Sequence, residues 1–365
     1  MTELYDIAII GAGPAGSTLA RELARARADM KIILLDGQSA DNPKPCGGLL
    51  APDAQKVLAR FGLTLPTSVL DDPQIFAVET VDLGSNLVRY YQRHYLNMDR
   101  YAFDRWLISL VPESVEIVNA KCISVAESDG IFALKLHGGR EVVSKAVVGA
   151  DGAASIVRKS FFSPCKKKYI AIQQHFSTDA DTLPAYSCIF DRETSDSCSW
   201  SIRKRGRIIF GGAFNISDGR AQFEKQKARL EEFYGISLGE PTKTEACLVC
   251  SPRRKRDFNC GRASAYLVGE AAGFISSSSF EGISSAMLSG KLLADALSVA
   301  ESPKSAIGSY RKKCRKLQLK LSAKIIKRAV LCSPLSRELI MKSGIESVEK
   351  YNNNSHNANV YNIAK

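Results

Sequence analysis

Histidine and long apolar runs are scarce in this sequence. The chain has four histidines among 365 residues, far apart from one another, so we expect no metal centre and no Ser/His/Asp triad. No segment approaches the roughly 18 uninterrupted apolar residues that a membrane-spanning helix needs. The first ten residues carry Glu3 and Asp6 without a basic region, which argues against a secretory signal. The ten cysteines follow no regular spacing, and we therefore expect reduced thiols in a cytosolic protein.

Acidic residues are in deficit. Lys and Arg total 50 and Asp and Glu total 38, so the net charge is +12, which favours acidic partners such as nucleic acid, anionic lipid or a phosphorylated cofactor. Residues 302–337 contain no acidic side chain, and the helix expected over 308–331 carries an apolar stripe of Leu317, Leu321 and Ile325. Such a helix either docks on the core with a solvated basic face or rests on an anionic membrane. We expect no nucleic-acid partner, because aromatic platforms and groove-reading motifs are missing.

The N-terminal segment has the pattern of a nucleotide-binding βαβ unit. A strand expected over 5–10 runs into a glycine-rich turn and a helix over 17–28, and a second strand over 31–35 ends at an aspartate. Glycines in such a turn let the backbone approach a pyrophosphate, and the helix N-terminus offers N–H groups. The carboxylate can accept hydrogen bonds from a ribose. The expected dinucleotide-binding residues here are Gly11, Gly13, Pro14, Ala15, Gly16 and Asp36.

Two downstream segments decide between NAD and FAD. Residues 149–158 (GADGAASIVR) and 269–274 (GEAAGF) each follow an expected strand and place Asp151 and Glu270 in a Gly/Ala-rich turn. An acidic side chain in such a turn can bind ribose or ribityl hydroxyls, and a following helix can face a pyrophosphate. An extended FAD needs contacts from several distant segments, whereas an NAD site does not. The cofactor that we expect is FAD.

In combination, these motifs resemble the FAD-binding signature of the geranylgeranyl reductase family, within the larger group that includes p-hydroxybenzoate hydroxylase. Within that family the chain is most similar to the CbrA-type proteins, on residues 45–55, 186–191 and 269–275, and the resemblance covers about residues 5–345. It implies an α/β fold, with a Rossmann-like FAD-binding domain of the p-hydroxybenzoate hydroxylase type, a β-sheet substrate domain and C-terminal helices. The matching stretches are 11–16, 44–50, Arg100 with Phe103 and Asp104, 149–158, 269–273 and 281–283.

The expected domains are discontinuous along the chain. We expect the FAD-binding domain over 1–72, 97–165 and 245–300, and the β-sheet substrate domain over 73–96 and 166–244. A helical C-terminal region over 301–350 follows. The asparagine-rich tail over 351–365 has no core-forming pattern and is predicted to be disordered.

The resemblance also extends the set of expected site residues. It assigns cofactor-binding residues in five segments beyond the glycine-rich turn, and it makes a sheet segment around residue 200 the candidate substrate surface. Two positions depart from the family's pattern, because Glu270 stands where an aspartate is usual and Arg203 where a proline can stand. The added cofactor residues are Cys46, Gly47, Gly48, Arg100, Asp151, Gly269, Glu270, Gly273, Gly282 and Ile283, and the candidate substrate residues are Trp200 and Phe210.

Cys46 is the candidate catalytic residue. The resemblance implies that its Pro-Cys-Gly-Gly loop lies near the flavin ring, where a thiol can protonate a substrate carbon after hydride transfer, tune the flavin or form a transient adduct. The alternative is a small residue that only packs. Cys247 and Cys250 form a C-x-x-C pair within an apolar strand pattern. Alternation points them to opposite faces, so we expect neither zinc nor a disulfide there.

The sequence thus predicts an FAD-dependent oxidoreductase, and the resemblance implies reduction of C=C bonds in an isoprenoid or other hydrophobic substrate by hydride from the reduced flavin. No second strand–GxGxxG–helix unit is visible, so the external electron donor is NAD(P)H that visits transiently or a separate carrier. Two alternatives stay open: an FAD-dependent monooxygenase on the same scaffold, and a non-catalytic flavoprotein that binds lipid at a membrane surface. We expect a cytoplasmic location, with peripheral contact at the inner face of the membrane if the basic helix binds anionic lipid.

Overall fold

The computed structural model describes residues 3–38, 44–177 and 183–350, so the predicted disordered tail lies outside the described residues. The chain divides into two compact units. Unit 1 consists of Met1–Leu70, Met98–Tyr169 and Cys247–Ala329, and unit 2 of Asp71–Asn97, Ile170–Ala246 and Val330–Lys365. The helical C-terminal region is not a unit of its own, because its first part belongs to unit 1 and the rest to unit 2.

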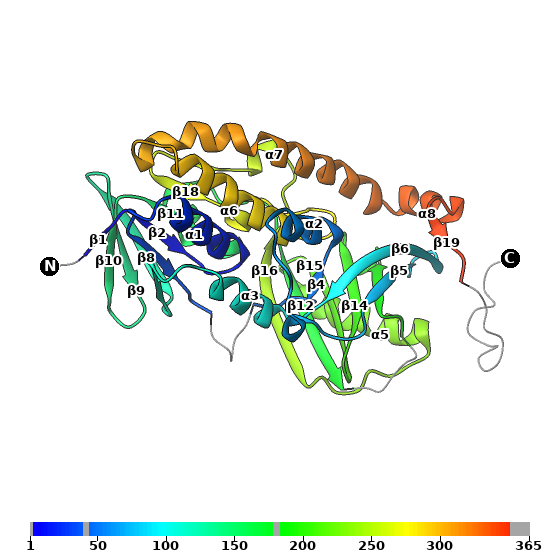
Figure 1. Cartoon of the computed structure of the whole chain (residues 1–365). Coiled ribbons are helices and arrows are strands. Elements are labelled where there is room, and N and C mark those ends of the chain that lie inside the picture. The colour runs from blue at the N-terminus through cyan, green and yellow to red at the C-terminus, as the bar shows by residue number, and fades with distance from the viewer. Residues whose placement is uncertain (1–2, 39–43, 178–182, 351–365) are drawn as a thin grey trace. The chain divides into compact units, whose positions relative to one another are not determined.

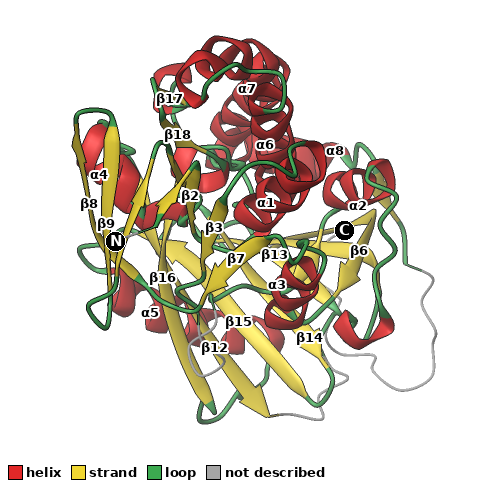
Figure 2. Cartoon of the chain, turned by 60° about the vertical axis from the view of Figure 1, so that its left-hand side comes forward, coloured by secondary structure: helices red, strands yellow, loops and turns green. Residues whose placement is uncertain are grey.

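The core of unit 1 is a mainly parallel sheet with the strand order β17-β18-β11-β2-β3-β7. Its central strands β2 (Ile7–Ile10) and β3 (Ile32–Leu35) are buried at every residue, as expected where both faces of a parallel sheet are covered. The helices α1 (Pro14–Ala26) and α6 (Ile283–Leu297) lie side by side on it (Figures 1 and 2). The other strands are β7 (Val115–Val118), β11 (Val147–Gly149), β17 (Gly261–Arg262) and β18 (Ala265–Leu267).

Unit 1 also contains a smaller sheet, in the order β1-β10-β9-β8, and the long helix α7 (Ala306–Leu331). The apolar stripe predicted for this basic helix packs into the core of unit 1 through Leu317 and Leu321, so the helix docks on the protein by this face. The remaining elements of unit 1 are short. They are β1 (Leu4–Tyr5), β4 (Leu49–Leu50), β8 (Cys122–Ser128), β9 (Ile131–Leu136), β10 (Glu141–Ser144), α2 (Pro52–Arg60), α3 (Arg100–Ser109), α4 (Ile156–Phe161), and the 3-10 helices η1 (Thr67–Val69), η2 (Gly152–Ala154), η3 (Lys255–Asp257), η4 (Gly269–Ala272) and η5 (Pro303–Ser305).

Unit 2 is built on a large sheet with the strand order β16-β12-β15-β14-β13-β5-β6-β19. One face of this sheet packs against α5 (Gly219–Tyr234), where Phe210, Phe214 and Phe223 form the centre of the core. A buried ion pair of 2.8 Å joins Arg337 of α8 (Pro334–Ser343) to Asp82 of the sheet. The strands are β5 (Ile75–Asp82), β6 (Leu87–Asn97), β12 (Lys168–Ser177), β13 (Tyr186–Phe190), β14 (Cys198–Lys204), β15 (Arg207–Phe214), β16 (Lys243–Cys250) and β19 (Ser347–Val348).

Candidate cofactor site

The turn between β2 and α1 is shaped by glycines that tolerate no side chain. Gly11 has a φ of +104°, and a Cβ on it would lie 2.6 Å from the carbonyl oxygen of Ala150. A Cβ on Gly16 would lie 1.9 Å from the carbonyl oxygen of Gly11. Both positions therefore require glycine for close packing of backbone on backbone.

Gly13 is different, because its missing side chain leaves space open in front of α1. Apart from its chain neighbours, no described atom lies within 4 Å of the position that its Cβ would take. Pro14 occupies the first helical position, and no side chain of the described residues caps the helix. An uncapped helix start that faces open space is the arrangement in which helix N-termini bind phosphates.

Segments far apart in the sequence meet around this turn within unit 1. A Cβ on Gly269 would lie 3.0 Å from the Cβ of Ala15, so the start of η4 packs directly on the first turn of α1. A Cβ on Gly152 would lie 3.5 Å from Lys44 Nζ and 3.7 Å from Glu270 Oε2. The structure thus brings together four of the segments in which cofactor-binding residues were expected.

Asp151 carries an acceptor atom that the protein does not use. Its Oδ2 accepts a hydrogen bond of 2.7 Å from the backbone N–H of Ile156. Its Oδ1 is buried and has no hydrogen-bond partner among the described residues. Burial raises the pKa of this carboxyl to about 6, because the charged form loses its hydration. Such an oxygen is suited to accept a hydrogen bond from a ligand hydroxyl.

Glu270, in contrast, is fully occupied by protein partners. Its Oε2 forms an ion pair of 3.1 Å with Lys44, and its Oε1 accepts a hydrogen bond of 2.9 Å from the backbone N–H of Cys250. The carboxylate raises the pKa of Lys44 above its ordinary value. The side chain, one methylene longer than aspartate, therefore links the loop at residue 44 to η4 and to Cys250 within unit 1.

The loop that carries Cys46 is fixed to the start of α3. The Cys46 Sγ accepts a hydrogen bond of 3.4 Å from the backbone N–H of Gly48, and it also contacts the Arg100 side chain. Arg100 Nε donates to Asp104 Oδ1 at 2.9 Å. Burial alone would lower the pKa of Arg100, but the carboxylate of Asp104 and the Cys46 sulfur raise it above its ordinary value. The sulfur thus lies beside a permanent positive charge.

Cys247 lies close to the same loop. Its thiol approaches the backbone carbonyl of Pro45 at 4.0 Å, and burial raises its pKa to about 11. Cys250, the second member of the C-x-x-C, is buried and interacts with Cys165. The described residues contain no group of three or more His, Cys, Asp or Glu side chains arranged to hold a metal ion.

Asp36 is buried at the end of β3, where the sequence analysis expected a ribose-binding carboxylate. Its Oδ1 accepts a hydrogen bond of 3.1 Å from the backbone N–H of Gln38, and its Oδ2 lies 2.6 Å from a guanidinium nitrogen of Arg105 on α3. Arg105 was not among the predicted site residues. Its only signal was a second arginine on the helix that begins with Arg100.

The remaining expected cofactor residues shape turns around η4 and α6. Gly273 has a φ of +80°, and a Cβ on it would lie 2.7 Å from the carbonyl oxygen of Asp257. Gly282 is the N-cap of α6 and Ile283 its first residue, with no side-chain cap there among the described residues. Gly47 precedes Gly48 in the Cys46 loop, and the φ of Gly48 is +66°.

Arg158 has a structural role at the junction of these segments. Its guanidinium donates to the backbone oxygens of Ser163 at 3.0 Å, Ala271 at 2.9 Å and Asp257 at 2.9 Å. It therefore ties α4 to η4 and η3.

The two candidate substrate residues of unit 2 lie on opposite faces of the sheet. Trp200 pairs with Gly211, whereas Phe210 pairs with Ser201, and alternate residues of a strand point to opposite faces. Phe210 is fully buried under α5, where its ring stacks on Phe223 with 5.3 Å between the centroids. It packs the core of unit 2 instead of lining a substrate surface. The Trp200 indole N–H is buried without an acceptor in the described part of the chain.

A polar cluster that the sequence analysis missed shares the face of Trp200. Gln173 on β12 pairs with Gly211, and its amide donates to Glu245 Oε2 at 2.7 Å. His175, two residues further along the strand, lies 3.1 Å from the same oxygen. Burial alone would raise the pKa of Glu245, but hydrogen bonds from His175, Lys243 and Gln173 lower it to about 2. The only sequence signal was the i, i+2 spacing of Gln173 and His175.

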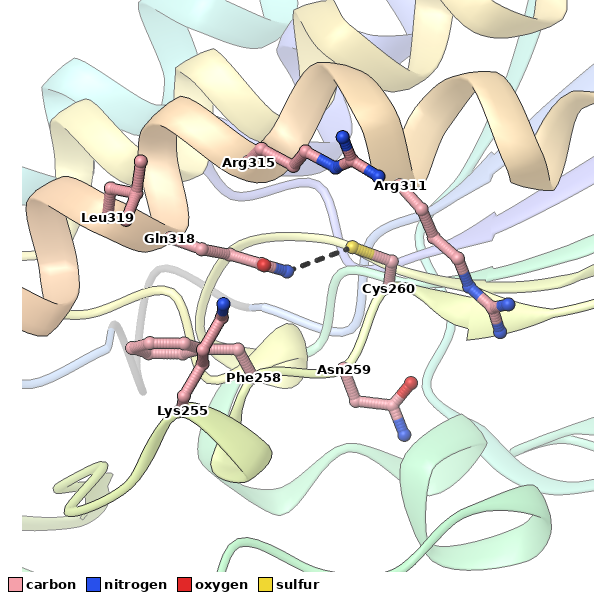
Figure 3. Close-up of a pocket in the computed structure, with 8 residues that line it drawn as sticks. All are labelled: Lys255, Phe258, Asn259, Cys260, Arg311, Arg315, Gln318 and Leu319. Atoms are coloured by element: carbon pink, nitrogen blue, oxygen red, sulfur yellow. Dashed lines mark hydrogen bonds between the residues drawn. The ribbon is translucent and has the colours of Figure 1, made fainter.

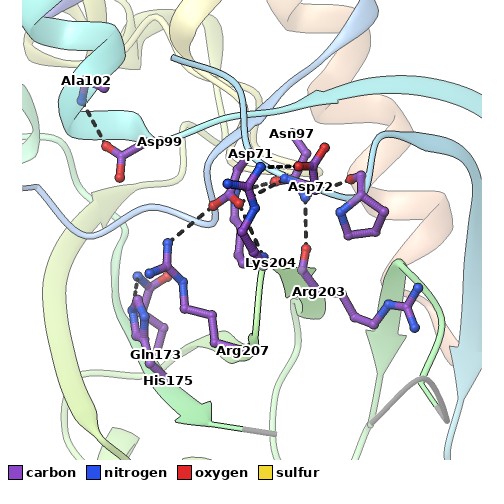
Figure 4. A network of polar contacts seen from close by, with 12 residues as sticks. Asp71, Asp72, Asn97, Asp99, Ala102, Gln173, His175, Arg203, Lys204 and Arg207 are labelled. Atoms are coloured by element: carbon purple, nitrogen blue, oxygen red, sulfur yellow. Dashed lines mark hydrogen bonds and ion pairs between the residues drawn. The ribbon is translucent and has the colours of Figure 1, made fainter. Parts of the chain in front are cut away.

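Arg203, the second departure from the family's pattern, lies in a polar network of unit 2 (Figure 4). Its backbone oxygen accepts a hydrogen bond of 2.9 Å from the Asn97 side chain. In the turn that follows, the Asp71 carboxylate accepts from the backbone N–H of Arg205 at 3.3 Å and pairs with Arg207 at 3.3 Å. The segment with Arg203 is therefore bound to the end of β6 by backbone as well as side-chain contacts.

The fold is that of FAD-dependent oxidoreductases and monooxygenases, as solved structures show. A geranylgeranyl bacteriochlorophyll reductase-like protein from Thermoplasma acidophilum matches with a TM-score of 0.79 and 19% identity, over 97% of this chain and 94% of that chain. PqsL from Pseudomonas aeruginosa, a probable FAD-dependent monooxygenase, matches with a TM-score of 0.67 and 17% identity, over 94% and 100%. The predicted α/β fold class is confirmed.

The sequence comparisons define the family. The family model described as lycopene cyclase protein matches residues 6–178. Protein CbrA of Escherichia coli K12 is 44% identical over 355 residues, which cover 95% of this chain and 98% of that protein. The chain therefore belongs to the CbrA family, and the resemblance seen in its motifs is confirmed.

Proposed function

We propose that this chain binds FAD in unit 1 and is an FAD-dependent oxidoreductase. The observation that carries the proposal is the convergence of the segments 11–16, 149–158 and 269–273 with the Lys44 loop around an uncapped helix start, next to the vacant acceptor of Asp151. Protein folds rarely leave a buried acceptor unused, and a dinucleotide has the phosphates and hydroxyls that complete such a site.

Each group of residues has a distinct role in this proposal. The N–H groups at the start of α1 bind the pyrophosphate, for which Gly13 leaves room. The carboxylate of Asp36 and the guanidinium of Arg105 face the adenosine ribose, and Asp151 Oδ1 accepts from a hydroxyl of the ribityl chain. Held there, FAD supplies the two-electron hydride chemistry that side chains lack.

The reaction that we propose is reduction of C=C bonds in an isoprenoid or other hydrophobic substrate. Hydride addition to one carbon leaves the other in need of a proton, and the Cys46 thiol is the proton donor in this scheme. Arg100, beside the sulfur, stabilises the thiolate that remains. The name of the reductase-like structural neighbour supports this choice. Electrons come from NAD(P)H that binds transiently or from a separate carrier.

A monooxygenase is the second candidate, because PqsL and p-nitrophenol 4-monooxygenase PnpA from Pseudomonas putida share the fold, the latter with a TM-score of 0.66. In that case the Cys46 thiol would not be needed to protonate carbon.

None of the helices in the described ranges has the length and apolar character of a transmembrane helix. We propose that the enzyme acts in the cytoplasm.

The decisive experiment is anaerobic reduction of the purified protein's flavin, followed by exposure to a panel of polyprenyl lipids without oxygen. A reductase reoxidises its flavin in the presence of the right lipid and forms a saturated product. A monooxygenase requires oxygen and consumes it only with substrate. Flavin that is bound but reoxidised by no substrate would indicate a non-catalytic lipid-binding flavoprotein. Protein that purifies without flavin and takes up none would contradict the proposal as a whole.

A further inference from the structure

A cavity of unit 1 lies between η3 and α7 (Figure 3). Its volume is about 460 Å³, which is enough for a phosphorylated headgroup. None of its lining residues belongs to the cofactor set of the sequence analysis. Three are cationic, two are amides, two are apolar and one is a thiol: Lys255, Arg311, Arg315, Asn259, Gln318, Phe258, Leu319 and Cys260.

The cavity has positive charge and no carboxylate in its lining. Lys255 and Arg315 form no ion pair or hydrogen bond with any described side chain, and both are exposed. Arg311 uses one N–H to donate to the backbone oxygen of Gly261 at 2.6 Å, and a guanidinium has five such donors. Since residues 302–337 contain no acidic side chain, nothing on α7 neutralises these cations.

The helix that carries the two arginines is firmly positioned. The Tyr310 hydroxyl donates to the backbone oxygen of Leu267 at 2.9 Å, and Cys314 and Leu317 are buried in the core of unit 1. Arg311 and Arg315 therefore project from a docked helix at i and i+4, on one side of the cavity. Within the lining, the Gln318 amide donates a hydrogen bond of 3.7 Å to the Cys260 sulfur.

The rim of the cavity is apolar as well as basic. Leu319 lines the cavity and is 64% exposed, and Ile326, seven residues further along the same helix, is 69% exposed. Exposed apolar side chains beside cationic ones are typical of surfaces that meet amphiphiles and anionic membranes.

We propose that this cavity binds a phosphate ester. Lys255, Arg311 and Arg315 surround its phosphate group, and Leu319 contacts the attached carbon chain. The ester is either the headgroup of an anionic lipid or a soluble phosphate ester. Guanidinium and ammonium groups bind phosphate oxygens by charge-assisted hydrogen bonds.

The test compares two variants that lose the same charge. Lys255→Ala with Arg315→Ala removes two cations of the cavity, and Lys312→Ala with Lys313→Ala removes two exposed cations of the same helix outside it. In the first arm, phosphatidylcholine vesicles containing phosphatidic acid or, instead, phosphatidylserine are sedimented with each protein. In the second arm, inorganic phosphate and glycerol phosphate are titrated calorimetrically. Circular dichroism confirms folding of the variants.

We expect phosphatidic acid vesicles to bind better than phosphatidylserine vesicles, and the cavity variant to lose this preference with about tenfold weaker binding. The Lys312/Lys313 variant should keep the preference. Binding of vesicles without binding of free phosphate assigns the lipid headgroup, and binding of glycerol phosphate at similar affinity assigns a soluble ester. Equal losses in both variants would show only general attraction to negative charge and would overturn the proposal. The absence of binding in both arms would overturn it too.

Discussion

The glycines of unit 1 and unit 2 serve different kinds of contact. In the cofactor turn of unit 1, a Cβ on Gly11 or Gly16 would meet backbone oxygens at 2.6 Å and 1.9 Å. In the sheet of unit 2, a Cβ on Gly211 would meet the Trp200 side chain at 2.6 Å, and one on Gly212 the Ser199 side chain at 2.3 Å. A substitution can make a neighbouring side chain smaller, but it cannot remove a backbone oxygen. The glycines that contact backbone therefore form a short motif that can be recognised in the sequence, whereas the glycines that contact side chains do not.

The largest effect on stability is expected in unit 2, from loss of a buried ion pair. Arg337→Ala leaves Asp82 buried without its partner, and both side chains are less than 5% exposed. We expect a loss of about 3–5 kcal/mol in the free energy of unfolding, measured by urea denaturation. Arg205→Ala, which breaks an exposed pair with Asp72, is the control and should cost below about 1 kcal/mol. If the cofactor site belongs to unit 1, the Arg337 variant should still bind flavin under native conditions.

A smaller effect, of opposite sign, is expected at Asp151. Its pKa rises from 3.8 to about 6 on burial, so between these values the folded protein holds a proton that the unfolded chain has released. The stability of the flavin-free protein therefore falls as the pH rises through this window and stays lower above it. Asp151→Asn removes this cost, and we expect the variant to be about 3 kcal/mol more stable near neutral pH and above.

The pH dependence distinguishes this explanation from a general packing effect. The advantage of Asp151→Asn should disappear below the lower end of the window, where the carboxyl is protonated in both states. Urea denaturation of both flavin-free proteins at acidic and alkaline pH measures it. The variant should also bind FAD more weakly. A stability difference that is the same at both pH values would contradict the assigned cause.

Gly16→Ala tests the backbone contacts of unit 1 directly. We expect a loss of about 1–3 kcal/mol, because the new methyl group cannot be accommodated by rotation of a side chain, and protein that purifies without the visible absorbance of flavin. Gly308→Ala is the matched control, because outside its own helix backbone and chain neighbours no described atom lies within 4 Å of the new Cβ there. This exchange, near the start of α7, should leave flavin content unchanged. Flavin retained at the wild-type level in Gly16→Ala would remove the turn from the binding site.

The smallest effect on stability is expected at Cys46. Cys46→Ser exchanges one small side chain for another of the same shape, so folding and flavin content should stay as in the wild type. The rate of substrate-dependent flavin reoxidation should fall by about two orders of magnitude if the thiol donates a proton. Stopped-flow absorbance under anaerobic conditions measures the rate. An unchanged rate would leave Cys46 with a packing role alone.

Much of unit 1 was predictable because steric limits on the backbone allow few residue types in its strand, turn and helix. The strand, glycine turn and helix over 5–28 follow from steric limits on the backbone, and the helix expected over 308–331 is observed as Ala306–Leu331. Arg105 was not predictable as a partner of Asp36, because the pairing of α3 with the end of β3 depends on how distant segments pack. The role of Phe210 was missed for a similar reason, since strand register decides which face a residue occupies.

The sequence by itself determined the class of fold, since alternation, glycine turns and acidic residues after strands are local consequences of backbone sterics and hydrogen bonding. It also determined the excess of positive charge and its concentration on one helix. Only the tertiary structure decided where the basic side chains of that helix lie. The helix α7 buries its apolar stripe in unit 1, and Arg311 and Arg315 line a cavity together with η3. The tertiary structure likewise decided that Glu270 is neutralised by Lys44 while one oxygen of Asp151 is left without a partner among the described residues. Such differences arise from contacts between residues far apart in the chain, which no local pattern encodes.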